Sequence, residues 1–170
     1  MVQKLQKRKE SGFTIIEVLI VLAIAGLIMV VVFLAVPALQ RSGRNNALNT
    51  DANNVLSAVG NYATNNGGTL PAALAATAPS GGKVTIGASG TNQETAKVGS
   101  GTATVQIDDG STPITTSSAA IGTIQVVTGA NGTCNPTSTG LSGTAASSRS
   151  YAVLYVAESG SGKILKCVGS

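Results

Sequence analysis

The hydrophobic residues of this chain are concentrated in one long run near its start. Residues 18–36 contain no charged side chain. At about 1.5 Å of helical rise per residue, the run is long enough to cross the roughly 30 Å hydrocarbon core of a bilayer. In lipid the backbone must satisfy its own hydrogen bonds, so such a run is helical despite the β preference of Val and Ile. The pattern predicts a membrane-spanning helix.

After residue 39 the pattern becomes that of an amphipathic helix. Apolar residues recur at spacings of three and four residues, with Asn side chains mostly between them. The apolar positions are Leu48, Ala52, Val55, Val59 and Tyr62. The sequence NNGG at residues 65–68 then predicts the end of the helix, because glycine tolerates the left-handed conformation that a C-cap needs. The helix should therefore be some fifty residues long, with one face against a folded domain.

Two residues could interrupt the membrane half of this helix. Gly26 lies within the apolar run, and Pro37 lies near its far edge, where it removes a backbone donor. We expect either a simple kink at Pro37 or local melting of the helix there.

The remainder of the chain predicts a small β-sheet domain. Residues 69–82 read as a loop with a short helical turn at 72–76, and residues 87–101 and 108–120 read as long mobile loops. Five segments bounded by Gly, Ser, Asn or Pro read as strands: residues 83–86, 102–107, 121–127, 150–157 and 163–168. The turn at 158–162 joins the last two, which should form an antiparallel hairpin.

One acidic residue, Glu17, lies inside the apolar stretch, about one turn from its polar edge. A carboxylate in lipid costs about 2.5 to 3.5 kcal/mol on insertion scales, so such a residue normally has a partner. The apolar run offers no cation, and Lys9 is more than two helical turns away. Glu17 must therefore either reach the headgroups or receive a positive group from elsewhere.

The residues before the apolar run form a basic segment that ends in a glycine. Its cationic residues are Lys4, Lys7, Arg8 and Lys9. Gly12 directly precedes Phe13, and cleavage between them would create a new α-amino group. The string KRKESGFTIIEVLIVLAIAGL closely resembles the class III signal of type IV prepilins, and Gly12, Phe13 and Glu17 match its pattern.

In that family a leader peptidase cuts after the glycine and methylates the new N-terminus. The resemblance implies that Phe13 is N-methylated and that Glu17 pairs with the Phe13 amine of a neighbouring subunit as the helices bundle into a filament. The implied partners are the prepilin peptidase, a pilus assembly platform and further copies of the chain. The precursor would cross the cytoplasmic membrane once, and the assembled form would be a cell-surface pilus.

The resemblance also implies the pilin fold, an α+β arrangement of one long N-terminal helix on a small antiparallel β-sheet. We expect a cleaved leader at residues 1–12, a transmembrane and assembly helix at 13–39, its amphipathic continuation at 40–66 and an extracellular sheet domain at 67–170. Prepilins often carry a proline near the position of Pro37, about one turn earlier. The implied function is that of a structural subunit without enzymatic activity or cofactor, used for adhesion or twitching motility.

Several alternatives stay open at this point. Within the same class, the chain could be a pseudopilin of a type II secretion system or of a competence system for DNA uptake. From another class, it could be a signal-anchored binding protein whose Glu17 reaches the headgroups. A secretory signal cut near residues 36–38 is disfavoured, because the apolar region exceeds the 7 to 15 residues typical of such signals.

Composition narrows the range of functions. With 170 residues, of which 43% are hydrophobic, the chain has room for one small domain beyond its anchor. Four of its eleven Lys and Arg residues lie in the leader, so the basic balance reflects a cytoplasmic leader rather than nucleic-acid binding. The chain has no histidine, which excludes a Ser-His-Asp triad and leaves few ligands for zinc or haem; we expect no metal site.

The two cysteines, Cys134 and Cys167, fit a translocated domain rich in Gly, Ser and Thr. We expect a disulfide, with two free thiols as the alternative. The bond would stabilise the domain by roughly 3 to 4 kcal/mol in the loop-entropy model. Pilins often enclose a C-terminal region between such cysteines, and that region is usually exposed on the filament.

Three further motifs are interpreted as surface features. The GSGK of residues 160–163 lacks the earlier glycine and the final Ser/Thr of a phosphate-binding loop, so it predicts a turn. Asp108-Asp109 lacks the spacing of an EF-hand loop. The sequon at residues 131–133 is interpreted as chance.

Nucleic acid is a weakly supported partner. Three cations, Arg149, Lys163 and Lys166, lie on or near the predicted terminal hairpin with Tyr151 and Tyr155. Phosphate binding normally recruits more charge, and tyrosines on strands are usually core residues.

Overall fold

The structure is a computed structural model. It describes residues 12–72, 74–90, 92–108, 114, 118–129, 134, 149–160 and 162–169, with the backbone alone at 74–76. The chain divides into two compact units, Met1–Gln40 and Arg41–Ser170. The first contains the apolar part of the long helix, and the second contains the rest of that helix together with the sheets.

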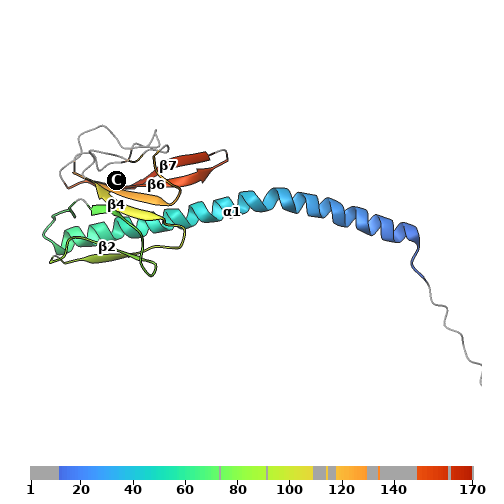
Figure 1. The fold of residues 1–170 in the computed structure, drawn as a ribbon, viewed down its shortest axis with the longest axis horizontal. Helices are drawn as coiled ribbons and strands as arrows, with labels where there is room; N and C mark the ends of the chain where they lie inside the picture. The colour runs from blue at the N-terminus through green and yellow to red at the C-terminus, as the bar shows by residue number, and fades with distance from the viewer. Residues whose placement is uncertain are drawn as a thin grey trace, which may run out of the picture. The chain divides into compact units, whose positions relative to one another are not determined.

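One helix and seven strands make up the described secondary structure (Figure 1). The elements are α1 Ile15–Asn65, β1 Leu74–Thr77, β2 Lys83–Ile86, β3 Glu94–Lys97, β4 Thr104–Asp108, β5 Thr123–Thr128, β6 Tyr151–Ser159 and β7 Gly162–Gly169. The α+β class predicted from the sequence is confirmed.

Helix α1 has the predicted length and the predicted end. It is 51 residues long and continues through Pro37 without a break. At its C-terminus Gly67 adopts a φ of 65°, and the N–H of Gly68 donates to the carbonyl of Ala63 at 2.7 Å. This pattern is a Schellman cap, which satisfies a carbonyl that the helix itself leaves open. The NNGG sequence therefore ends the helix for the predicted reason.

The strands form a five-stranded sheet, ordered β1-β4-β5-β6-β7, and a separate two-stranded sheet of β2 and β3. The predicted hairpin is confirmed, because β6 pairs antiparallel with the whole length of β7, from Ala152↔Gly169 to Ser159↔Gly162. One pair differs from the antiparallel sheet that the sequence led us to expect: β4 and β5 are parallel. The larger sheet is therefore mixed.

Two strands were not predicted. The helical turn expected at residues 72–76 is wrong, since β1 lies there and pairs with β4. The expectation of a continuous mobile loop at residues 87–101 is also wrong, because β3 pairs with β2 in full register, from Lys83↔Lys97 to Ile86↔Glu94. Both segments form strands because each pairs with a neighbouring strand, since their own composition does not favour a strand.

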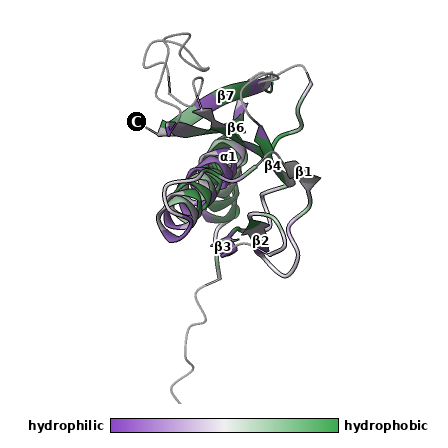
Figure 2. Ribbon diagram, turned by 90° about the vertical axis from the view of Figure 1, so that its left-hand side faces the viewer, coloured by the Kyte–Doolittle hydropathy of each residue, from purple (hydrophilic) through white to green (hydrophobic). Residues whose placement is uncertain are grey.

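The main core surrounds the second half of α1, which lies between the two sheets (Figure 2). The five apolar residues predicted to line one face of the helix are all buried. From the small sheet, Val84 and Ile86 enter this core, and from the large sheet Val126, Val153 and Tyr155 do. A single core thus joins the helix to both sheets in the second unit.

The other face of the large sheet carries a smaller core. Leu154, Val156 and Leu165 lie there, covered by Ile114 and Ala119 from the connection between β4 and β5. The sequence predicted that residues 108–120 form a mobile loop, and its described part instead packs on the sheet. A parallel pair needs a crossover connection, and this crossover provides the cover.

Asparagine side chains, rather than ion pairs, make most polar contacts between α1 and the sheets in the part of the chain that the structure describes. Asn49 donates to the hydroxyl of Tyr155 at 2.8 Å, and Asn54 donates to the carbonyl of Lys97 at 3.0 Å. At the helix end, Asn65 donates to Oε1 of Glu94 at 2.6 Å. The asparagines beside the apolar stripe therefore fix the position of the helix along both sheets.

Candidate functional site

The predicted cleavage site lies outside regular structure. Gly12, Phe13 and Thr14 precede α1 and are exposed, and Phe13 is 90% exposed. No described heavy atom lies within 4 Å of the position that a Cβ of Gly12 would occupy. A side chain at position 12 would therefore meet no described atom. The basic residues of the predicted leader lie outside the described part of the chain.

Glu17 has a partner that was not predicted from the sequence. The N–H of Thr14 donates to Oε2 of Glu17 at 2.9 Å, and the Thr14 hydroxyl donates to the same oxygen at 2.7 Å. In return, the N–H of Glu17 donates to the Thr14 hydroxyl at 3.3 Å. This reciprocal arrangement is a capping box. The sequence carries the signal for it, Thr-x-x-Glu before an apolar run, although the prediction concerned only cations as partners.

The surface around Glu17 is apolar and exposed. Phe13, Val18 and Val21 line a surface hollow together with Glu17. The large hydrophobic side chains of α1 between residues 15 and 39 are 39% to 81% exposed. Among the described residues, this helix is the one element long and apolar enough to cross a membrane. A helix of this kind needs lipid or other helices around it, since water is a poor environment for so large an apolar surface.

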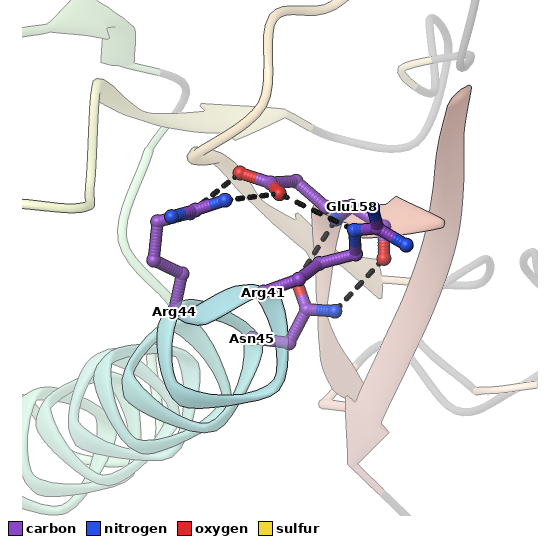
Figure 3. Close-up of polar contacts among 4 residues, drawn as sticks. All are labelled: Arg41, Arg44, Asn45 and Glu158. Atoms are coloured by element: carbon purple, nitrogen blue, oxygen red, sulfur yellow. Dashed lines mark hydrogen bonds and ion pairs between the residues drawn. The ribbon is translucent and has the colours of Figure 1, made fainter. Parts of the chain in front are cut away.

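At the start of the second unit, α1 carries a cluster of polar contacts to the end of β6 (Figure 3). The guanidinium of Arg44 donates to both carboxylate oxygens of Glu158, at 2.7 and 2.6 Å, and Arg41 lies 3.9 Å from the same carboxylate. The hydrogen bond from Arg44 lowers the pKa of Glu158, and the nearby charges add to this effect. The same bond raises the pKa of Arg44.

The predicted cysteine partners form a disulfide. The Cα atoms of Cys134 and Cys167 lie 5.7 Å apart, and 33 positions separate the two residues in sequence. Cys167 belongs to β7, so the bond fixes the segment after β5 to the edge strand of the large sheet.

In the described part of the chain, the motifs that we interpreted as surface features form no ligand-binding or metal site. The GSGK sequence lies at the turn between β6 and β7, and Lys163 donates to the carbonyl of Ala119 at 2.8 Å. Asp108 is the last residue of β4, whereas Asp109 and the sequon at 131–133 lie outside the described residues. Among the described side chains, no group of His, Cys, Asp or Glu could hold a metal ion.

The residues considered for nucleic-acid binding are not brought together as one surface. Tyr155 is buried in the core, and the Tyr151 hydroxyl lies against Gly60 of α1. Lys163 and Lys166 are three positions apart on β7, so their side chains leave opposite faces of the strand. Arg149 lies beside Gly68, at the end of the helix.

Comparison with known proteins agrees with the geometry of the N-terminal segment. Residues 7–33 match the model of the prokaryotic N-terminal methylation motif. No curated protein and no solved structure matches the chain. The matched segment contains Gly12, Phe13 and Glu17 together with most of the apolar run. This motif, with one long apolar helix behind it, fits a membrane-anchored precursor and implies processing by a prepilin peptidase. The chain therefore carries the N-terminal signal of a type IV pilin-like protein, a class that includes pilins and pseudopilins.

Proposed function

We propose that this chain is the precursor of a type IV pilus subunit that polymerises through its N-terminal helix. The observation that carries the proposal is the position of Glu17, a carboxylate at the start of an exposed apolar helix and close to the predicted cleavage site. Cleavage after Gly12 would create an amine at Phe13 near the level of this carboxylate. A role in adhesion or twitching motility, rather than catalysis, follows from this assignment.

The mechanism starts from a carboxylate that is satisfied within its own chain. In the precursor, Thr14 occupies Oε2 of Glu17. An ammonium from a neighbouring subunit is a stronger partner in an apolar environment than a neutral donor, because its full positive charge attracts the carboxylate strongly in a medium of low dielectric constant. Helices that shift relative to one another until this pair forms would acquire a fixed axial register. Glu17 would thus select the position of each new subunit.

Replacing Glu17 by glutamine tests the proposal. The glutamine side chain would keep an acceptor for Thr14, since a capping box accepts Glu or Gln, but would lose the charge that binds an amine. We expect Glu17→Gln to insert into the membrane and be cleaved at Gly12, yet to give few or no filaments. Asn53→Ala, in the second half of the same helix, is the control and should assemble, because the Asn53 side chain bonds only to Asn49 among the described residues. Normal filaments from Glu17→Gln would overturn the proposed role of the charge.

The alternative in the same class is a pseudopilin of a secretion or competence system. It shares the N-terminal signal, so Glu17→Gln does not separate the two. Electron microscopy of cells that express the chain at its native level does separate them. Long surface filaments that contain the chain support a pilus subunit, whereas short structures confined to the cell envelope support a pseudopilin.

A further inference from the structure

The turn of α1 that enters the second unit is held by side chains rather than by the core. That unit begins at Arg41, but Leu48 is the first helix residue buried in its core. Between these two positions, the described hydrogen bonds and ion pairs to the sheet come from Arg41, Arg44 and Asn45, and all of them end on Glu158 (Figure 3). Almost two helical turns therefore depend on one residue of β6.

This part of the helix is intrinsically weak. Ser42 and Gly43 lie in it side by side, and glycine in a helix is about 1 kcal/mol less favourable than alanine. Gly-Ser pairs are also frequent positions of helix kinks. No described atom lies within 4 Å of the Cβ position of Gly43, so close packing does not explain the glycine. The segment would be a natural hinge if nothing held it.

Asn45 holds the segment by acting as a substitute for a missing strand. Along the edge of β6 that faces β5, the carbonyl of Val156 accepts from Gly122, just before β5 begins. Two residues further along β6, the backbone N–H and carbonyl of Glu158 face the same side, but β5 does not extend far enough to pair with them. There the amide of Asn45 donates to the Glu158 carbonyl at 2.8 Å, and its oxygen accepts from the Glu158 N–H at 2.9 Å. One side chain thereby makes both bonds that a strand would make.

The two arginines add an electrostatic contribution to the attachment of this helix segment to Glu158. Arg44 makes two short bonds to the Glu158 carboxylate, and the Arg41 guanidinium lies over the hairpin turn, 3.7 Å from the Cβ position of Gly160. The side chains of Arg44 and Arg41 are 52% and 35% exposed, so salt can screen this part. Lys163, opposite Glu158 on β7, is engaged with the Ala119 carbonyl instead.

We propose that Arg44 and Asn45 latch the Ser42–Gly43 segment of α1 onto Glu158, and that this latch sets where the free part of the helix begins. When the latch is closed, the helix leaves the domain at Arg41. When it is open, the helix leaves the domain at Leu48 and the Ser42–Gly43 segment becomes a hinge. This inference concerns the second unit by itself and does not depend on filament formation.

Hydrogen exchange on the full chain in detergent micelles tests the latch. We expect Asn45→Ala to speed exchange of the amides in residues 41–47 and in residues 157–163 together. The rise should be roughly five- to hundredfold, the range expected for the loss of two hydrogen bonds. The matched control is Asn53→Ala, on the same helix, because the Asn53 side chain bonds only to Asn49 among the described residues. It should leave both segments unchanged.

A double variant distinguishes a hinge at Ser42–Gly43 from a general loosening of the domain. Adding Gly43→Ala to Asn45→Ala should slow exchange in residues 41–47 again, while residues 157–163 stay fast. If Asn45→Ala does not fold, Arg44→Ala should raise exchange in the same two segments by a smaller factor. Exchange in residues 41–47 that stays at the wild-type rate in both latch variants would overturn the proposal, since the helix would then hold that segment without Glu158.

Discussion

The hydroxyl and the backbone N–H of Thr14 both donate to one carboxylate oxygen of Glu17, at 2.7 and 2.9 Å. The helix thus begins with a capping box whose acid lies at the edge of an apolar surface. Thr14 holds this carboxylate through Oε2 alone, so the other oxygen, Oε1, can accept a bond from the amine of a neighbour while the cap stays in place.

The first prediction concerns the start of the helix. Thr14→Ala removes the cap, which should cost about 1 kcal/mol of local helix stability and speed exchange of the amides at residues 16 and 17 roughly fivefold. Thr14→Ser keeps the hydroxyl and should resemble the wild type. Hydrogen exchange in detergent micelles measures both variants. Equal exchange in the alanine and serine variants would show that the capping box does not stabilise the helix start.

The second prediction concerns pH. The Arg44 hydrogen bond lowers the pKa of Glu158 below its ordinary value of 4.5. A carboxyl whose pKa is lower in the folded state stabilises the fold above its unfolded pKa, and this contribution is lost as the pH falls through the folded value. The stability difference between the wild type and Glu158→Gln should therefore be constant near neutral pH and shrink below about pH 4.5. Urea unfolding at a series of pH values measures it, and a difference that does not change down to about pH 2 would contradict the account.

The third prediction concerns a buried acid of α1. Asp51 is 6% exposed, and its Oδ2 accepts the N–H of Gly99 at 2.9 Å and the hydroxyl of Thr102 at 2.7 Å. Asp51→Ala leaves these two donors without an acceptor, so we expect a loss of about 1 to 3 kcal/mol in the free energy of unfolding. Asp51→Asn keeps one acceptor oxygen and should lose less. Urea unfolding compares the two, and equal losses would mean that the acceptor itself contributes little.

The fourth prediction concerns the close approach between the segments that directly precede β4 and β5. Gly122 has a φ of 86°, and a Cβ there would collide with the carbonyl oxygen of Gly101. Gly81 has a φ of 57° but open space around its Cβ position, so it serves as the control. Gly81→Ala should cost about 1 to 2 kcal/mol, from the left-handed conformation alone. Gly122→Ala should cost clearly more. Thermal unfolding measures both variants, and equal destabilisation would rule out the collision.

The features that could be predicted from the sequence are those that depend on residues close to one another along the chain. The apolar stripe from Leu48 to Tyr62, the Gly67 cap and the β6–β7 hairpin are all local patterns, and the structure confirms them. The disulfide was predicted from the number of cysteines and their setting, which needs no knowledge of the topology.

The features that were missed depend on distant partners. Residues 74–77 read LAAT, a composition that favours a helix, yet they pair with β4 as a strand. Residues 94–97 read ETAK and contribute one small apolar residue, Ala96, to the core. The Asn45–Glu158 contact joins residues 113 positions apart. No local pattern contains this information, because tertiary pairing decides it.

The most direct test of the central claim is the intact mass and N-terminal sequence of the protein recovered from the cell surface. The account predicts a chain that starts at Phe13, heavier by one methyl group and lighter by the two hydrogens lost in the disulfide. A chain that starts at Met1 would be a plain signal anchor, and one that starts at Leu39 a secreted soluble protein. Either start would contradict the filament mechanism built on Glu17.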